Sequence, residues 1–329
     1  MQAIRIVSPG GPEQLQPVTV PDPVPGHDEV LVRIHYAGIN RADLLQRRGL
    51  YPAPPGTDSS IPGMEYSGVI AACGAGVSGW HVGDRVMGLV PGTAYAELVC
   101  VPATELLQVP DNIDLRGAAA IPEAFMTAWD AAWLQGGLRD GEWLLVRAAT
   151  SSVGIAACQL ALALGNPHIA MSRSAERLAA LAPALSPTAR MLEGDPELVT
   201  NILQLTGQEG VATILDLVGA PAFDDYLRCL RIGGSLLLVG VLGGAPKSFD
   251  AGTLMRRRLR LVGTVMRTRR PDERAALAAR FRRDVLPMFG AGSIAPLVAA
   301  EYPLAEASHA HALIEANQQL GKVVLRCSP

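Results

Sequence analysis

The sequence has little net charge and few cysteines, and each shortage argues against a class of protein. The formal net charge of its 329 residues is only -3, so no overall attraction to nucleic acid or to an anionic membrane is expected. The five cysteines are scattered and odd in number, which is typical of reduced thiols and not of a disulfide framework. We therefore expect a cytoplasmic protein.

Long apolar runs are also missing. The best candidate for a membrane span, Leu236 to Val241, is soon followed by Gly243 and Gly244 and is too short to cross a bilayer. Residues Met1 to Pro9 alternate apolar with polar side chains, which predicts a first strand and not a signal peptide. With 49% apolar and 18% charged residues, the chain has the composition of a compact soluble enzyme.

Two patterns of secondary structure divide most of the chain. Residues 1–121 contain short β-type runs such as Glu29 to Ile34, interrupted by proline and glycine, as in an irregular all-β domain. Residues 122–265 alternate buried strands with alanine-rich helices. This alternation predicts a doubly wound parallel sheet of the nucleotide-binding kind, and hence an α/β fold class for the whole chain.

The last zone, residues 266–329, returns to short strands. A helix is expected from Pro271 until Pro287 stops it, and a second helix from His309 to Gln318. Strands are predicted at Val298 to Pro303 and at Lys322 to Leu325. Because these strands are like those of residues 1–121, we expect the chain to return to the first domain and complete it.

A phosphate-binding turn is predicted after the strand that ends at Val146. The turn consists of small residues and leads into an apolar helix from Ile155, whose free N–H groups and positive dipole end would cradle a pyrophosphate. Of the usual glycines only Gly154 is present, and Ser151 and Ser152 stand where glycine lets the backbone approach phosphate most closely. Serine hydroxyls can bond to phosphate instead. An ordinary strand-turn-helix without a ligand is the alternative.

The next strand, His168 to Met171, ends in Ser172, Arg173 and Ser174, with Arg177 one turn later. A site for NAD places an acidic residue about 20 residues beyond the turn, to bind the ribose 2′-hydroxyl. That acid is missing, and Arg173 and Arg177 offer charge-assisted donors suited to a 2′-phosphate. The pattern favours NADPH over NADH. The alternative is that Arg177 is a solvated helix residue.

Six separated segments carry a wider resemblance. They are Ala37 to Pro52, Pro62 to Gly68, Ile121 to Trp129, Gly240 to Gly244, Met266 to Arg269 and Asn317 to Lys322. Together they resemble the medium-chain dehydrogenase/reductase superfamily, in its zinc-free quinone oxidoreductase branch. The resemblance implies a GroES-like catalytic domain over residues 1–121 completed by 266–329, a Rossmann domain over residues 122–265 that binds NADPH, and a homodimer.

The resemblance also implies a role for individual residues. The pyrophosphate would be lined by Ser151, Ser152, Val153 and Gly154, and the adenosine phosphate by Ser174 and Arg177. The nicotinamide half would be bordered by Val218, Gly240, Val241, Leu242, Val265 and Asn317. The reacting ring would be faced by Asn40, Tyr51 and Thr127. Leu192 and Glu193 stand where relatives often carry a tyrosine-lysine pair near the adenosine.

The zinc ligands of metal-dependent relatives are missing. Met64 replaces their histidine, no cysteine lies between Met1 and Ala72, and no C-x-x-C occurs. Neither a catalytic nor a structural zinc site is therefore expected. His309 and His311 do not replace it, because side chains two apart on a helix diverge.

Without a metal to stabilise an alkoxide, reduction of a quinone is the more favourable chemistry. It mainly requires that nicotinamide and acceptor be held face to face. Tyr51 either donates a hydrogen bond or proton to the developing oxyanion or is a surface tyrosine in a Tyr-Pro turn. Asn40 either positions the substrate or nicotinamide or satisfies backbone groups of a turn. The predicted function is NADPH-dependent, zinc-independent reduction of quinones by electron or hydride transfer.

Two rival functions stay open. The same constellation permits hydride addition to an activated double bond, as in an enoyl or alkenal reductase. A nucleic-acid-binding protein with a retained dehydrogenase fold is the second rival, because residues 256–283 hold eleven arginines against two acidic residues. The residues between these arginines are aliphatic and not aromatic, so the stacking surface expected for single strands is missing.

Overall fold

Two structural units make up the chain, of which the computed structural model describes residues 1–317 and 319–328. Met1–Glu123 together with Met266–Pro329 form the first unit, and Ala124–Val265 form the second. Each unit has its own hydrophobic core. The helix α3 (Pro122–Trp129) begins in the first unit and continues in the second.

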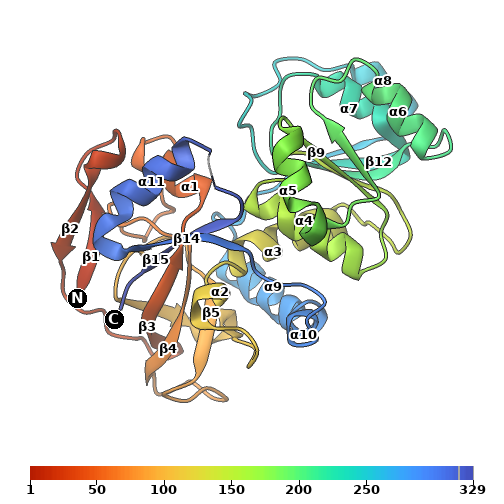
Figure 1. Ribbon diagram of the computed structural model, residues 1–329. Helices are drawn as coiled ribbons and strands as arrows, with labels where there is room; N and C mark the ends of the chain where they lie inside the picture. The colour runs from red at the N-terminus through yellow and green to blue at the C-terminus, as the bar shows by residue number, and fades with distance from the viewer. Residues whose placement is uncertain (318, 329) are drawn as a thin grey trace. The chain divides into compact units, whose positions relative to one another are not determined.

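A seven-stranded, mostly antiparallel sheet is the framework of the first unit (Figure 1). Its spatial order is β14 (Val298–Pro303), β15 (Lys322–Arg326), β3 (Glu29–Gly38), β4 (Glu65–Cys73), β5 (Arg85–Leu89) and β7 (Leu107–Gln108), and β6 (Leu98–Pro102) pairs with β3. A separate antiparallel ribbon consists of β1 (Gln2–Ile6) and β2 (Leu15–Thr19). Many short strands joined by Pro- and Gly-rich turns are what residues 1–121 predict.

The C-terminal strands complete this sheet. β15 pairs antiparallel with β3, with Val324 opposite Gly38 and Leu325 opposite Ala37. β14 in turn pairs parallel with β15. Val323 and Leu325 join the hydrophobic core of the unit. The C-terminal strands therefore belong to the same sheet as the strands of residues 1–121.

Short helices cover the first unit. They are α1 (Arg41–Arg47), α2 (Leu115–Ala118), α9 (Pro271–Asp284), α10 (Leu286–Gly290) and α11 (Ala307–Glu315), with 3-10 turns η1 (Pro12–Gln14), η2 (Ala103–Glu105) and η4 (Leu304–Glu306). The helix that begins at Pro271 ends at Asp284, before Pro287 as predicted, and Pro287 then lies in the first turn of the separate helix α10. Helix α11 ends at Glu315 and not at Gln318, which lies outside the described residues.

Six parallel strands form the sheet of the second unit. Their order is β10 (Ala189–Leu192), β9 (His168–Ser172), β8 (Leu144–Val146), β11 (Val211–Asp216), β12 (Leu230–Leu238) and β13 (Arg260–Gly263). Every residue of β11 is buried, as expected of a central parallel strand covered on both faces. The predicted fold class, a GroES-like β domain with a doubly wound Rossmann domain, is confirmed.

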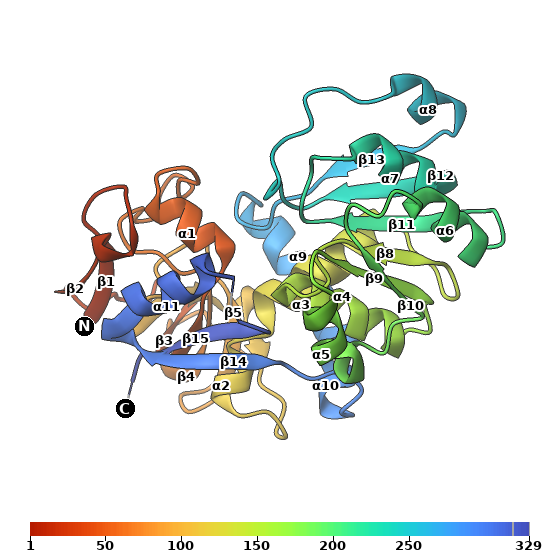
Figure 2. The same cartoon turned by 45° about the horizontal axis from the view of Figure 1, so that its top comes forward.

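Helices cover both faces of this parallel sheet. They are α4 (Ser152–Ala163), α5 (Ala175–Leu185), α6 (Leu198–Leu205), α7 (Phe223–Cys229) and α8 (Ala251–Arg256), preceded by a π-helical turn η3 (Asp130–Gln135). Helices α4 and α5 pack against each other, as do α6 and α7 (Figure 2). The carboxyl ends of β8, β9, β11 and β12 therefore lead into loops along one edge of the sheet, where ligands of such folds bind.

The apolar strand β12 lies inside the sheet and not at its edge. It lies between β11 and β13, and its Leu236 and Leu237 are fully buried. The last strand in the order is β13, and its Leu261 is 37% exposed. Continuous apolar character in β12 reflects burial on both faces and not an edge.

Candidate active site

The turn between β8 and α4 has the geometry of an anion cradle. Ser151 caps α4, with its Oγ accepting from the Gly154 N–H at 3.1 Å. The N–H groups of Ser152 and Val153, in the same first turn, make no hydrogen bond among the described residues. Two backbone donors at the positive end of a helix dipole thus remain for a phosphate.

Gly154 makes this turn possible. A Cβ added there would lie 2.4 Å from the carbonyl oxygen of Ala148 and 2.6 Å from Cα of Ala149. The helix therefore packs on the end of the strand more closely than any side chain would allow, which is the role of the last glycine in a dinucleotide-binding turn. The serines do not alter this packing, because Ser151 and Ser152 lie on the outer side of the turn and are half-buried.

The tip of β9 is positively charged and polar. Arg173 is exposed, and Ser174 caps α5 by accepting from the Arg177 N–H at 3.2 Å. Partial burial lowers the pKa of Arg177, and the charge of Arg173 lowers it further. The two guanidinium groups are thus close enough to repel each other, and an anion between them would relieve that repulsion.

A hydroxyl pair joins the β9 tip to the phosphate turn. Thr150 Oγ1 and Ser172 Oγ are 3.3 Å apart, and Ser172 Oγ accepts from the Ser174 N–H at 3.3 Å. Glu193 follows strand β10, and its N–H donates to the Ser172 carbonyl at 3.0 Å. A carboxylate in this position counts against the binding of a phosphate. The adenosine end of the candidate site therefore contains both arginines and two carboxylates, that of Glu193 and that of Glu176, which lies between the arginines in the sequence.

The residues predicted for the nicotinamide half lie on loops that follow β11 and β12. Val218 accepts at its carbonyl from the Gly243 N–H at 2.8 Å, which ties the two loops together. Gly240 is half-buried, and Val241, Leu242 and Val265 are 47%, 56% and 45% exposed. Apolar side chains with this exposure are available to cover an aromatic ring.

Asn40 belongs to a buried cluster in the first unit. Lys322 Nζ donates to Asn40 Oδ1 at 2.6 Å and forms an ion pair with Glu65 Oε1 at 2.5 Å. Asn40 Nδ2 donates to the same Glu65 oxygen at 2.9 Å. The amide of Asn40 is thereby fixed between a cation and an anion, and only one of its N–H groups is used. Sequence reasoning missed Lys322, because a lysine at the start of an apolar strand looks like an ordinary exposed residue.

Tyr51 is half-buried and is held by Arg267. Arg267 donates from Nη1 to the Tyr51 carbonyl at 3.2 Å, from Nε to the Pro91 carbonyl at 2.6 Å and from Nη2 to Gln46 Oε1 at 2.6 Å. Burial raises the pKa of the Tyr51 phenol, and the charge of Arg267 opposes the shift. Tyr51 is therefore a neutral hydrogen-bond donor at neutral pH and not only a surface residue of a turn.

Thr127 and Asn317 complete the predicted set. Thr127 is buried on α3 in the second unit, whereas Asn40 and Tyr51 belong to the first, so their joint contact with one ring stays a prediction. Asn317 follows α11 with a φ of +52°, a left-handed conformation that asparagine tolerates. Its Oδ1 accepts from Arg41 at 2.5 Å.

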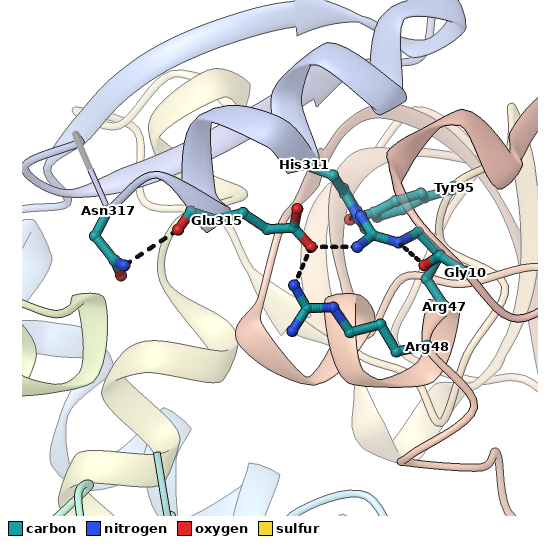
Figure 3. Close-up of polar contacts among 7 residues, drawn as sticks. All are labelled: Gly10, Arg47, Arg48, Tyr95, His311, Glu315 and Asn317. Atoms are coloured by element: carbon teal, nitrogen blue, oxygen red, sulfur yellow. Dashed lines mark hydrogen bonds and ion pairs between the residues drawn. The ribbon is translucent and has the colours of Figure 1, made fainter. Parts of the chain in front are cut away.

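A polar network lies beneath Asn317 (Figure 3). Glu315 pairs with both Arg47 and Arg48, and Arg47 Nη1 lies 3.2 Å from His311 Nδ1. His311 Nε2 is 2.9 Å from the hydroxyl of Tyr95. Since arginine only donates, His311 must accept at Nδ1 and carry its proton on Nε2. The buried His311 and the exposed His309 diverge as predicted.

The arginines of the basic segment are divided between the two units. Four of its arginines, at positions 256, 257, 258 and 260, belong to the second unit, and the others belong to the first. Several are used internally: Arg257 donates to the Leu230 carbonyl, Arg274 pairs with Glu105 at 2.8 Å, and Arg282 donates to the Leu106 carbonyl at 3.1 Å. The observation that motivated a nucleic-acid function therefore has a structural explanation.

Other site types receive no support from the described part of the chain. Over residues 1–317 and 319–328 no group of three or more His, Cys, Asp or Glu side chains has an arrangement that would hold a metal ion. All five cysteines are free. In those same residues no helix is both long and apolar enough to cross a membrane.

Two family models match the chain. The alcohol dehydrogenase GroES-like domain matches residues 26–111, and the zinc-binding dehydrogenase domain matches residues 152–282. The first match lies in the antiparallel unit. The second covers the phosphate turn and the β9 tip, and continues through α9.

Known proteins resemble the chain along nearly its whole length. A quinone oxidoreductase-like protein 2 from Bos taurus is 30% identical, covering 93% of this chain and 86% of that protein. An acryloyl-coenzyme A reductase from Sulfurisphaera tokodaii is 28% identical, covering 98% and 99%.

Solved structures share the fold. Escherichia coli quinone oxidoreductase complexed with NADPH has a TM-score of 0.86 at 27% identity, covering 99% of this chain and 100% of that one. An NAD-dependent alcohol dehydrogenase has a TM-score of 0.88 at 30% identity, covering 100% of both chains.

Proposed function

The chain belongs to the medium-chain dehydrogenase/reductase superfamily of oxidoreductases, and we propose that it reduces quinones with NADPH. The proposal is carried by one observation: the phosphate turn, with two N–H groups unpaired among the described residues, lies beside the tip of β9, where Arg173 stands in place of an acid and Arg177 follows on α5. The resemblance to a quinone oxidoreductase complexed with NADPH supports the same choice of cofactor.

The residues present fit such a cofactor. Ser152 and Val153 would bind the pyrophosphate through their N–H groups, and Arg173, Ser174 and Arg177 would hold the 2′-phosphate by charge-assisted hydrogen bonds. When bound, NADPH supplies a hydride from its nicotinamide ring. The NAD-dependent relative of similar fold makes this choice of cofactor a question for direct titration.

Reduction of a quinone to a hydroquinone takes up one hydride and one proton. We assign Tyr51 to the proton or hydrogen bond that stabilises the developing oxyanion, because its phenol is neutral and Arg267 holds its backbone carbonyl and lies near its ring. Asn40, fixed by Lys322 and Glu65, would orient the nicotinamide or the substrate with its remaining N–H. Thr127 is the third residue proposed to face the reacting ring.

Steady-state oxidation of NADPH against a panel of quinones and activated alkenes tests the function. Quinones are expected to turn over faster than any alkene, with hydroquinone formed in proportion to NADPH consumed. An alkene that turns over faster than every quinone would identify the chain as a double-bond reductase, the alternative supported by its likeness to an acryloyl-coenzyme A reductase. No NADPH oxidation with either class would contradict both proposals.

We further propose that the reaction needs no zinc, because Met64 stands in place of the ligand histidine and cysteine ligands are missing from the first 72 residues. Activity is expected to be unchanged after EDTA treatment, with no stoichiometric zinc by elemental analysis. One tightly held zinc per chain whose removal abolishes turnover would contradict this.

A cytoplasmic homodimer is the proposed state. Strand β13 ends the strand order of the parallel sheet, with the exposed Leu261 on it and Val265 just after it, so pairing of β13 with a second copy would satisfy its outer edge. Light scattering at micromolar concentration should give twice the chain mass, and a monomer would contradict the proposal. Free cysteines fit a reducing compartment, and no nucleic-acid partner is proposed.

A further inference from the structure

A buried arginine lies at the start of the phosphate turn. Arg147 follows β8 directly and is only 1% exposed. Its Nη1 donates to Asp216 Oδ1 at 2.8 Å and to the Gly219 carbonyl at 2.8 Å. Its guanidinium carbon lies 3.8 Å from the centroid of the Tyr226 ring, a cation–π contact. The cation is thus enclosed between the turn after β8 and the loop after β11.

Asp216 connects that cation to both loops of the nicotinamide half. Its Oδ1 also accepts from the N–H groups of Val218 at 2.8 Å and Gly219 at 3.0 Å. Its backbone carbonyl accepts from the Val239 N–H at 2.8 Å, directly before Gly240. Asp216 therefore fixes the first residues of both the loop that carries Val218 and the loop that carries Gly240.

The contribution of the Arg147–Asp216 ion pair to folding stability does not account for its burial. Arg147 Nε and Asp216 Oδ2 are buried without a hydrogen-bond partner in the described part of the chain. Burial raises the pKa of Asp216, while the Arg147 charge and the two loop N–H groups lower it. Replacing a buried ion pair by apolar side chains is often neutral or stabilising. Buried polar atoms without hydrogen-bond partners break the usual packing rules, and such exceptions are found mainly at functional sites.

We propose that Arg147 is a positioning residue: with Asp216 and Gly219 it fixes the phosphate turn relative to the Val218 loop, so that the nicotinamide half of the cofactor binds in one orientation. The inference rests on the proposed binding of NADPH. The adenosine half is held by the tip of β9, its arginines and the N–H groups at the start of α4, none of which bonds directly to Arg147 or Asp216 in the described residues.

The two halves can be measured separately. Adenosine 2′,5′-bisphosphate carries the phosphates of the adenosine half and no nicotinamide, so its affinity reports the β9 tip and the N–H groups of the phosphate turn without the nicotinamide loops. NADPH affinity, the fluorescence of bound NADPH and kcat report the nicotinamide as well. The variant is Arg147→Met, which keeps an unbranched apolar side chain and removes the charged guanidinium, and the control is Arg190→Met, at an exposed arginine on β10 of the same sheet.

Calorimetry should find that Arg147→Met binds NADPH about 10- to 100-fold more weakly, the loss expected when one or two charge-assisted hydrogen bonds are removed. Its affinity for adenosine 2′,5′-bisphosphate should stay within about twofold of wild type. The fluorescence enhancement of bound NADPH and kcat should fall as well, and Arg147→Lys should restore part of each, because an ammonium can still pair with Asp216. Arg190→Met should behave as wild type.

If Arg147→Met does not fold, the double variant Arg147→Met with Asp216→Asn replaces it. That variant leaves no unpaired charge and keeps an oxygen for the Val218 and Gly219 N–H groups, so it should fold and show the same selective loss. Equal losses for NADPH and adenosine 2′,5′-bisphosphate in a folded variant, or no loss of NADPH affinity or kcat, would overturn the inference. Wild-type protein that fails to bind NADPH would instead refute the proposed function.

Discussion

The guanidinium carbon of Arg267 lies 5.3 Å from the centroid of the Tyr51 ring. The same side chain is 2% exposed and donates to the Tyr51 and Pro91 carbonyls and to Gln46. Arg267 therefore joins the segment that begins at Met266 to the loop that begins at Tyr51. A charged residue inside this loop cluster fixes the position of the phenol that we assign to the substrate oxyanion.

Substitution of Tyr51 tests that assignment. Tyr51→Phe keeps the ring over Arg267 and removes only the hydroxyl, so kcat for a quinone should fall about 10- to 100-fold, as for loss of one hydrogen bond made in the transition state. The dissociation constant of NADPH should not change. Stopped-flow measurement of NADPH oxidation at saturating quinone gives the rate directly, and an unchanged rate would return Tyr51 to the role of a surface residue.

We expect Arg267 to affect turnover by holding the Tyr51 phenol in position. Arg267→Lys retains the charge but not the three separate donor contacts, so the loop should loosen and kcat/KM for quinones should fall about 10-fold or more. Arg270→Lys is a matched control, because Arg270 is exposed and pairs with Asp272 at 2.8 Å. In the Tyr51→Phe background the effect of Arg267→Lys on kcat should shrink. Additive losses would show that Arg267 does not act through Tyr51.

Substitution of Glu193 is expected to strengthen NADPH binding at the adenosine end of the site. Its N–H is bonded to Ser172, beside Arg173, and its carboxylate would repel a 2′-phosphate. Glu193→Lys should tighten NADPH about 3- to 10-fold, the range of a partly exposed charge contact, and leave NADH nearly unchanged. Glu197→Lys changes the net charge equally at an exposed position and is the control. Equal tightening by both variants would assign the gain to net charge alone.

His311 predicts a pH dependence of stability. Burial, together with the charge of Arg47, lowers its pKa to about 3. The folded protein therefore holds His311 neutral, whereas the unfolded chain binds a proton below pH 6.5, so this contribution to stability is complete above pH 6.5 and is lost as the pH falls toward 3. Asp43, whose pKa burial raises to about 7, has the opposite effect on stability over most of the same range.

A difference between two proteins isolates the histidine. His311→Gln should be less stable than wild type at pH 8, and its deficit in the free energy of unfolding should shrink by about 1.4 kcal/mol per pH unit below pH 6.5. Both proteins contain Asp43, so its contribution cancels. Urea unfolding between pH 4.5 and 8 measures the deficit, and a deficit independent of pH would show that His311 does not remain neutral in the fold.

The sequence predicts those parts of the structure that depend on neighbours along the chain. The strand, turn and helix around Gly154 follow from local pattern, since close packing there tolerates only glycine. The missing acid at the β9 tip is equally local. Both lie within a single strand-turn-helix unit, for which periodicity and turn residues are informative.

Contacts between residues that are far apart in the sequence cannot be predicted from local pattern. Lys322 and Asn40 are separated by 282 positions, and nothing in either segment indicates the other. Arg147 lies in a turn of small residues where an arginine normally faces solvent, and its burial depends on Asp216 and Tyr226. The arginine excess in residues 256–283 is the opposite case. It is evident from the sequence, but the arginines that make it up belong to different units.

Cofactor choice is the central claim, and titration of NADPH and NADH into wild type and Arg173→Asp by calorimetry tests it most directly. Wild type should bind NADPH about 10- to 150-fold more tightly than NADH, as expected for charge-assisted contacts to the 2′-phosphate. Arg173→Asp should lose most of its NADPH affinity and little of its NADH affinity, because the new carboxylate repels the phosphate and accepts from a ribose hydroxyl. Equal affinity for both cofactors in wild type, or equal losses in the variant, would contradict the account.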